Sequence, residues 1–199
     1  MEQGLGRLAL EPALARAARG FADYMARTDH YGHTADGTQP ADRASERGYD
    51  YCLVSENIAY QYSSEPLATA ELARRYVEGW KDSPGHRKNM LEPAATDMAV
   101  AVARSSRTGR FYAVQMFGRP RSQAIEFRVT NAARRSIDYR VAGKGFTLRA
   151  GQGRIHTVCA PEDVSFPGAE NAEGRVIRPS GGDNLVVAGG ARLTIRQER

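Results

Sequence analysis

The sequence predicts an α+β protein in which a helix, sheet, helix sandwich over residues 1–121 is followed by a small all-β domain, a sandwich or barrel, over residues 122–199. Three observations predict this organisation. Apolar residues recur at helical spacing up to about residue 90, strand-type alternation begins at residue 97, and only short strand-like runs follow residue 120. The length of 199 residues and the hydrophobic content of 41% suit a folded chain of one large domain or two small ones.

Four helices are expected in the first domain, over residues 11–27, 41–47, 66–81 and 84–90. The first carries a stripe of apolar residues that includes Leu14, Phe21 and Met25, and Pro12 suits its first turn. The second ends before Gly48. The fourth follows Ser83 as N-cap and Pro84 as first helical residue.

A β-hairpin is expected next, with strands from Asp97 to Ala103 and from Arg110 to Phe117. Small alanines alternate with larger residues in these strands. This pattern indicates that helices cover both faces of the sheet.

The second domain is predicted from eight short alternating runs separated by turn residues. The runs are residues 125–129, 137–141, 146–148, 155–157, 164–166, 176–177, 185–187 and 193–195.

Five polar residues of the first domain are candidates for a binding site. His33 and His86 lie at a loop and at a helix start, where a side chain can reach a cleft. Glu56 precedes an apolar turn, and Glu78 and Asp82 lie at the end of the helix that leads to His86. Two imidazoles with neighbouring carboxylates are a plausible ligand set for Zn²⁺ or a related divalent ion.

Structural roles are the alternatives for the same segments. Glu56 could cap the turn that follows it, and Asn57 could hydrogen-bond the backbone of that loop. Tyr76 and Trp80 stand at helical spacing, which indicates core packing rather than a ligand platform.

The cysteines and the apolar runs of the sequence do not determine the cellular compartment of the protein. Cys52 and Cys159 lack metal-type spacing, and we expect two free thiols, with a disulfide between the domains as the alternative. No apolar run approaches the ~20 residues needed to cross a bilayer, so no transmembrane segment is expected. Residues 1–6 lack the basic-then-apolar pattern of a signal peptide.

Four motifs together resemble the bacterial branch of the CAP superfamily, also called SCP-like, which includes cysteine-rich secretory proteins, antigen 5 and pathogenesis-related proteins. The motifs are YGHT at 31–34, SENIA at 55–59, WKDSPGHRKNML at 80–91 and YAVQMFG at 112–118. The resemblance implies an α-β-α sandwich in a secreted, periplasmic or cell-surface protein, with a cleft that carries two histidines and two acidic residues.

His33, Glu56 and His86 match three of those four cleft positions. At the fourth, where animal and plant members have an acidic residue three places after the helix tryptophan, this chain has Ser83. Asp82 and Glu78 are the nearby carboxylates. The resemblance therefore implies a metal held by His33 and His86, within a cleft that these carboxylates also line.

Two functions follow from the resemblance. A non-enzymatic, metal-capable binding module would take a small hydrophobic ligand, a glycan or a protein partner. A metal-dependent peptidase or esterase would instead use Glu56 as general base on a metal-activated water. We favour the binding module, because nothing else in the sequence supports hydrolysis.

A third interpretation assigns polyanion binding to the second domain, which carries most of the positive excess of the chain. Its predicted strands carry arginines that should line their outer faces: Arg128, Arg140, Arg149, Arg154, Arg178, Arg192 and Arg196. No nucleic-acid-binding motif or aromatic interleaving appears, so the sequence disfavours nucleic acid as the partner.

Overall fold

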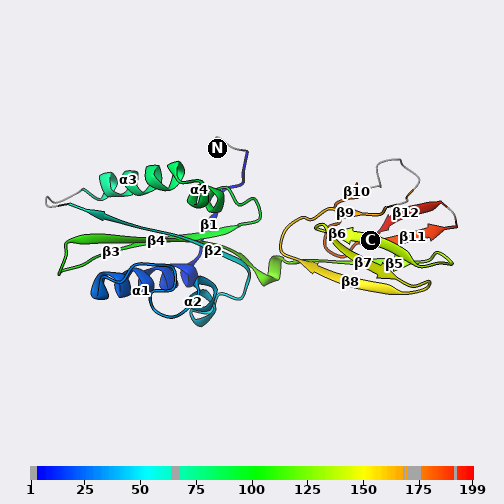
Figure 1. Ribbon diagram of the computed structural model, residues 1–199, viewed down its shortest axis with the longest axis horizontal. Helices are drawn as coiled ribbons and strands as arrows, with labels where there is room; N and C mark the ends of the chain where they lie inside the picture. The colour runs from blue at the N-terminus through cyan, green and yellow to red at the C-terminus, as the bar shows by residue number, and fades with distance from the viewer. Residues whose placement is uncertain (1–3, 64–67, 168, 170–175, 191) are drawn as a thin grey trace. The chain divides into compact units, whose positions relative to one another are not determined.

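The structure is a computed structural model that describes residues 4–63, 68–167, 169, 176–190 and 192–199 (Figure 1). It divides into two compact units, Met1–Ser122 and Gln123–Arg199. This division falls one residue from the boundary expected at residue 121.

In the residues that the structure describes, the first unit contains one four-stranded sheet and four helices. In chain order its elements are β1 (Ala9–Leu10), α1 (Pro12–Thr28), α2 (Pro40–Glu46), β2 (Tyr51–Tyr62), α3 (Thr69–Asp82), α4 (Pro84–Met90), β3 (Asp97–Arg104) and β4 (Arg110–Pro120), followed by the 3-10 turn η1 (Arg121–Gln123). The helices lie close to the predicted ranges. The expected start of the third, residues 66–67, lies outside the described residues.

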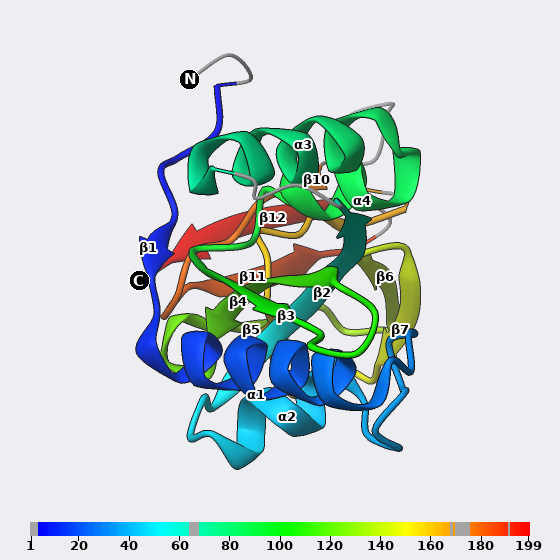
Figure 2. The same ribbon diagram turned by 90° about the vertical axis from the view of Figure 1, so that its left-hand side faces the viewer.

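The strands of this sheet are ordered β1-β3-β4-β2, and all pairs are antiparallel except β1 with β3. Helices α1 and α2 cover one face, and α3 and α4 cover the other (Figures 1 and 2). The predicted α+β sandwich is therefore present.

The α1 face holds the larger core. Leu14, Phe21 and Met25 of α1 are buried against Ala99 of β3 and Met116 of β4. Alternate side chains of a strand point to opposite faces, and that of Ala99 points to the α1 face. Because this side chain is short, the helix can approach the sheet closely. On the second face a smaller core gathers Leu72, Tyr76 and Trp80 of α3 over Ala113 of β4. The predicted core placement of Tyr76 and Trp80 is confirmed.

Strand β2 corrects the prediction of a turn after Glu56. Residues 51–62 form one continuous strand that pairs with β4, with a register irregularity only between Tyr51 and Leu53. The sequence shows no simple alternation here because β2 has buried polar side chains on both faces, Glu56 on one and Asn57 on the other.

The described part of the second unit contains two four-stranded sheets. Its elements are β5 (Ile125–Asn131), β6 (Ile137–Val141), β7 (Lys144–Leu148), β8 (Gly153–Val158), β9 (Val164–Ser165), β10 (Val176–Ile177), β11 (Asn184–Gly189) and β12 (Leu193–Glu198). The sheets are ordered β10-β9-β6-β7 and β12-β11-β5-β8. Phe127 and Leu185 from one sheet and Tyr139 and Val164 from the other are buried in one shared core.

Both cysteines are disulfide-bonded, so the expectation of two free thiols at Cys52 and Cys159 is wrong. Spacing in the sequence cannot show the redox state of two cysteines that are so far apart in the chain. Among the described residues, no helix is both long enough and apolar enough to cross a membrane.

Candidate functional site

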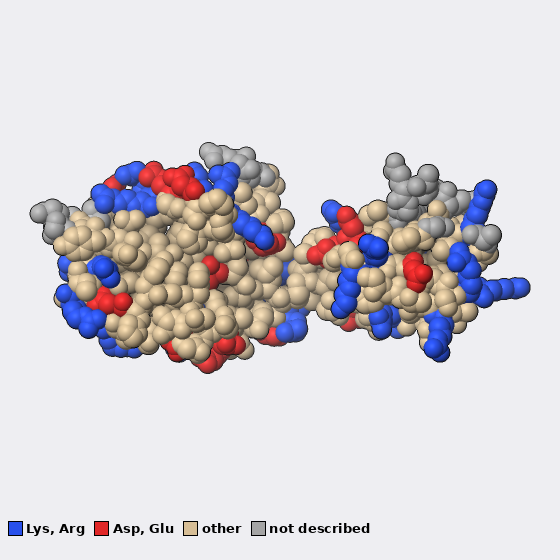
Figure 3. Space-filling view, in the orientation of Figure 1, with Lys and Arg blue, Asp and Glu red and all other residues tan. Residues whose placement is uncertain are grey.

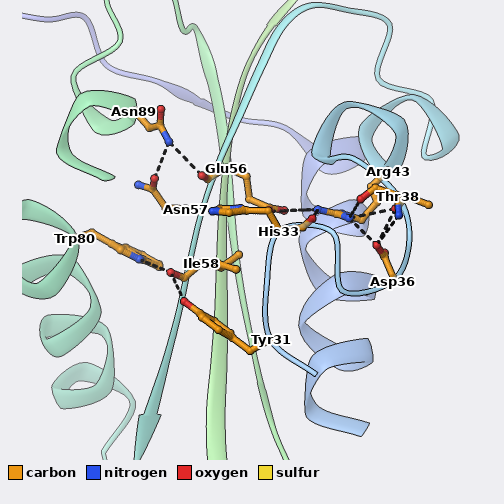
Figure 4. A network of polar contacts seen from close by, with 10 residues as sticks. All are labelled: Tyr31, His33, Asp36, Thr38, Arg43, Glu56, Asn57, Ile58, Trp80 and Asn89. Atoms are coloured by element: carbon orange, nitrogen blue, oxygen red, sulfur yellow. Dashed lines mark hydrogen bonds and ion pairs between the residues drawn. The ribbon is translucent and has the colours of Figure 1, made fainter. Parts of the chain in front are cut away.

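Strand β2 organises the site because it lies at the edge of its sheet. Successive side chains of a strand point to opposite faces. Glu56 therefore points to the α1 and α2 side, and Asn57 points to the α3 and α4 side (Figure 4). Through these two side chains, the segment 55–59 contacts polar groups from the α1 and α2 side and from the α3 and α4 side of the sheet.

The carboxylate of Glu56 is buried and fully engaged. Arg43 of α2 donates from Nη2 to both of its oxygens, at 3.0 and 3.2 Å. His33 places Nδ1 2.8 Å from Glu56 Oε1. The Glu56 side chain is 1% exposed and the His33 side chain 50%. This contact orients the His33 ring with Nδ1 toward the protein, which leaves Nε2 as its outward nitrogen.

Arg43 holds the loop before α2 in place. Its Nη1 donates to Asp36 Oδ1 at 2.9 Å and to the carbonyl of Thr38 at 3.0 Å, and its Nη2 donates to the carbonyl of His33 at 2.9 Å. Its guanidinium carbon lies 3.6 Å from the centre of the Phe21 ring. The guanidinium therefore fixes both the backbone of His33 and the carboxylate that His33 contacts.

On the opposite face, Asn57 connects β2 to α4. Its Nδ2 donates to the carbonyl of His86 at 3.1 Å and to Gln115 Oε1 at 3.0 Å, and its Oδ1 accepts from Asn89 Nδ2 at 2.9 Å. The same Asn89 nitrogen donates to the carbonyl of Glu56 at 3.1 Å. Asn57 is completely buried, so this network holds α4 and His86 against the strand.

The edge of β2 is also covered by aromatic side chains. The carbonyl of Ile58 accepts from the Tyr31 hydroxyl at 3.1 Å and from Trp80 Nε1 at 3.4 Å. These bonds satisfy a main-chain group that an edge strand would otherwise leave unpaired. They also bring two aromatic rings to the same edge as the histidines.

A pocket of about 260 Å³ opens beside this edge. Its lining residues come from β2, from α3 and α4, and from the loop before α2: Tyr31, Ile58, Ala59, Tyr60, Gln61, Arg75, Tyr76, Gly79, Trp80, Ser83 and His86. Tyr31 and Tyr60 pack edge to face with ring centres 5.1 Å apart, and each remains nearly half exposed.

The two predicted histidines are electrostatically coupled. Burial lowers the pKa of His86 below its ordinary 6.5, and the neighbouring His33 lowers it further. Of the three residues that match the cleft positions, His33 and Glu56 are in direct contact, and His86 lines the pocket.

Glu78 and Asp82 do not reach this site. Glu78 lies on the solvent side of α3, where Arg74 Nη1 lies 2.7 Å from its Oε2, in a row of mixed charges along the outer face of that helix (Figure 3). Asp82 is exposed at the end of α3 and does not line the pocket. Ser83, the residue at the expected acidic position, does line it.

The donor set does not form a three-ligand metal centre. No group of three or more His, Cys, Asp or Glu side chains is placed to hold a metal ion in the described part of the chain. The carboxylate nearest the histidines, Glu56, is occupied by Arg43. Of the residues predicted to line the cleft, the outward nitrogen of His33 and the ring of His86 are the groups that could still contact an ion.

Two site residues could not be singled out from the sequence. Arg43 is buried only because Phe21 and Glu56 meet it from distant segments. Tyr60 is one more aromatic residue in a polar stretch, and its position on the pocket rim depends on β2 being an edge strand. Neither the burial of Arg43 nor the position of Tyr60 at the pocket produces a recognisable pattern in the neighbouring sequence.

Comparison with known proteins decides the family. The model of the CAP, or cysteine-rich secretory protein, family matches residues 2–117. The chain belongs to this family. The matched range is the sandwich unit that carries the site, so the resemblance of the four motifs is confirmed.

The unit of residues 1–122, called the CAP unit from here on, has relatives in Bacillus subtilis. It is 32% identical over 112 residues to the uncharacterized membrane protein YlbC of Bacillus subtilis and 29% identical over 120 residues to the uncharacterized protein YkwD of the same organism. These matches cover 56% and 59% of this chain but only 30% and 42% of the relatives. The chain therefore spans less than half the length of either relative.

Two solved structures resemble the CAP unit. An outer surface protein from Borrelia burgdorferi aligns with a TM-score of 0.51 at 19% identity, over 60% of this chain and 82% of that one, which shows a shared fold. An extracellular protein containing a SCP domain from Bacillus anthracis aligns with a TM-score of 0.50 at 28% identity, over 59% of this chain and 35% of that one.

Proposed function

We propose that the protein is a non-enzymatic binding module that acts outside the cytoplasm and takes its ligand in the pocket beside His86. The observation that supports this most directly is the pair Tyr31 and Tyr60, which are 46% and 45% exposed at the mouth of the pocket. Exposed aromatic faces above a preformed hollow are typical of binding surfaces.

The chemistry of the pocket suits a ligand with an apolar or ring-shaped group. Tyr76, Trp80 and Ile58 supply apolar walls, while Arg75 and His86 supply polar groups. Burial of apolar area contributes roughly 25 cal/mol per Å², and the polar groups fix orientation. A small hydrophobic ligand, a glycan and a protein partner that inserts one side chain all fit this description.

Hydrolysis with Glu56 as general base is the weaker alternative. A general base needs a free lone pair within reach of the proton that it removes. Both oxygens of Glu56 accept hydrogen bonds from Arg43, and Oε1 also contacts His33. This geometry supports an orienting role for Glu56.

A divalent ion such as Zn²⁺ would be held by His33 and His86, with water or ligand atoms as the remaining donors. When bound, such an ion would supply a positive charge for an anionic or carbonyl group of the ligand. Metal analysis of protein purified without a histidine tag tests this proposal, because His33→Ala and His86→Ala should each reduce the metal content. Equal metal in all three proteins would contradict it.

The experiment for ligand binding uses Trp80, the single tryptophan of the chain, as an internal probe. We expect its emission to respond to a member of one of three ligand panels: fatty acids, cell-wall oligosaccharides or peptides. Tyr60→Ala should weaken the response about tenfold, since it removes an aromatic contact and its buried area. Tyr62→Ala is the matched control, because Tyr62 lies on the same strand, is 63% exposed and does not line the pocket.

Two outcomes would contradict the binding module. One is an unchanged Trp80 emission with all three panels. The other is turnover of a peptide or ester substrate that His86→Ala abolishes, which would favour the hydrolase.

A location outside the cytoplasm is supported by two observations. The structural neighbours are an outer surface protein and an extracellular protein by their own descriptions. Cys52 and Cys159 are disulfide-bonded, and disulfides persist mainly in oxidising compartments.

Polyanion binding by the second unit stays a separate proposal. The seven arginines expected on outer faces are exposed. Some already have partners, since Arg178 lies 2.8 Å from Asp163 and Arg154 stacks 5.2 Å from the centre of the Phe146 ring. A salt-dependent mobility shift on an anionic cell-wall polymer would support this function, and no binding at low salt would end it.

A further inference from the structure

The pocket beside His86 is lined by a positive charge and by no negative charge. Arg75 is the one arginine or lysine among its described lining residues, and none of them is an aspartate or a glutamate. A ligand with a carboxylate would therefore meet no like charge in the lining, whereas a ligand with an ammonium group would be repelled by the Arg75 guanidinium. The lining thus favours a ligand with a negative charge.

The guanidinium of Arg75 is held along one edge and has donors to spare. Its Nε lies 2.8 Å from Oε1 of Glu71, one helical turn earlier, and this contact orients the planar group. Nη1 and Nη2 donate no hydrogen bond to the described residues, and the side chain is 40% exposed. Two parallel N–H donors in one plane are the arrangement that binds a carboxylate through both of its oxygens.

The neighbouring carboxylates of α3 are bound mainly by Arg74. Arg74 donates to both oxygens of Glu71, at 2.9 and 3.0 Å, and to both oxygens of Glu78, at 2.7 and 2.9 Å. Neither Glu71 nor Glu78 lines the pocket. Because Glu71 is shared between two guanidinium groups and contacts Arg75 only at Nε, Arg75 keeps the capacity to bind a second carboxylate.

Gly79 leaves the α3 wall of the pocket open. It lies inside a helix, where glycine is less favourable than alanine. A Cβ at this position would meet no atom within 4 Å, so close packing against the described residues does not require a glycine here. Gly79 lines the pocket one turn after Arg75, together with Tyr76 and Trp80. The missing side chain therefore leaves space for a ligand beside these aromatic residues.

We propose that the ligand of this pocket is a small carboxylic acid with an aromatic ring, and that Arg75 binds its carboxylate. This inference rests on the proposed function, in which the pocket is the place where the ligand binds. The aromatic lining, with Tyr31, Tyr60, Tyr76 and Trp80, suits a ring. The volume of about 260 Å³ is slightly below that of pockets for drug-sized ligands, so it suits one ring on a short chain.

The test is a titration of the full chain in buffer that contains EDTA, so that no metal ion holds the carboxylate. Hydrocinnamate is the probe, hydrocinnamamide is its uncharged counterpart, and phenethylammonium carries the opposite charge. The readout is the indole N–H signal of Trp80 by NMR, because Trp80 is the single tryptophan and lines the pocket. We expect hydrocinnamate to bind about tenfold more tightly than its amide, and phenethylammonium to bind most weakly.

Three variants test the charge. Arg75→Gln should weaken the binding of hydrocinnamate about tenfold and leave that of the amide unchanged. Arg75→Lys keeps the charge but loses the paired donors, so we expect a smaller loss of about threefold. Lys81→Gln is the matched control, because it removes a positive charge from the same helix at an exposed residue that does not line the pocket. Its affinity for hydrocinnamate should equal that of the wild type.

Gly79→Leu tests the pocket itself. A leucine side chain would occupy the space that Gly79 leaves open, so all three probes should bind about tenfold more weakly or not at all. The same change should raise the urea midpoint of unfolding, because leucine favours a helix more than glycine does. A loss of binding in a more stable variant could not result from unfolding.

The outcomes separate this inference from the proposed function. Equal affinity for hydrocinnamate and its amide, or an unchanged preference in Arg75→Gln, would overturn the carboxylate assignment and leave the binding module in place. No response to any probe in the wild type would also overturn the assignment, and the three ligand panels would then decide the binding module. Wild-type affinity in Gly79→Leu would place the ligand outside this pocket and contradict both.

Discussion

Arg43 donates to both carboxylate oxygens of Glu56 from a position that is 6% exposed. This contact joins α2 to β2 and holds the carboxylate that orients His33. A buried ion pair is costly to break, since removal of one partner leaves the other charge uncompensated. The pair therefore identifies Glu56 as a support for the site.

Glu56→Gln is expected to destabilise the protein by about 3 kcal/mol, because Arg43 would keep only Asp36 as a carboxylate partner among the described residues. Glu78→Gln, which changes an exposed carboxylate paired with Arg74, should cost less than about 0.5 kcal/mol. Urea unfolding of both variants measures the difference. Equal costs would show that the buried pair does not support the fold.

Asn57→Ala is expected to cost about 2 kcal/mol, because it leaves Gln115 Oε1, Asn89 Nδ2 and the carbonyl of His86 each without one bond. Amide hydrogen exchange should also rise in α4, which Asn57 holds against the strand. Lys88→Ala in the same helix is the control, since Lys88 is exposed. Unchanged amide hydrogen exchange in α4 would show that Asn57 does not position His86.

Stability in acid should depend on Asp29, which follows α1. A hydrogen bond from Thr108 and further bonds from Arg107 and Tyr112 lower the pKa of Asp29 to about 2. Since the unfolded carboxyl has a pKa of 3.8, the unfolded chain takes up the proton first as pH falls. The contribution of Asp29 is complete above about pH 4 and is lost toward pH 2.

Asp29→Asn removes this titration, so its unfolding free energy should change less than that of the wild type between about pH 5 and about pH 2.5. Guanidinium unfolding at both pH values gives the comparison. Parallel losses in the two proteins would show that Asp29 does not titrate differently on folding.

Much of the fold could be predicted because its signals are local. The stripe through Leu14, Phe21 and Met25 predicts α1, and Ser83 with Pro84 predicts the start of α4. The eight short runs after residue 122 each coincide with one of the strands β5 to β12.

The candidate site was only partly predictable because its contacts are long-range. Resemblance pointed to His33, Glu56 and His86, of which His33 contacts Glu56 and His86 lines the pocket. It could not place Glu78. This residue faces solvent because it lies on the side of α3 that is turned away from the sheet. Arg43 lies in a short polar helix and is indistinguishable in sequence from a solvated arginine.

The proposed site depends most on two histidines from separate segments lying near one sheet edge. The most direct measurement is the pH titration of the His86 ring by NMR in the wild type and in His33→Gln. We predict a pKa below 6.5 in the wild type, because the ring is partly buried beside His33, and a higher pKa in the variant. A His86 titration that does not respond to the loss of His33 would contradict the shared site.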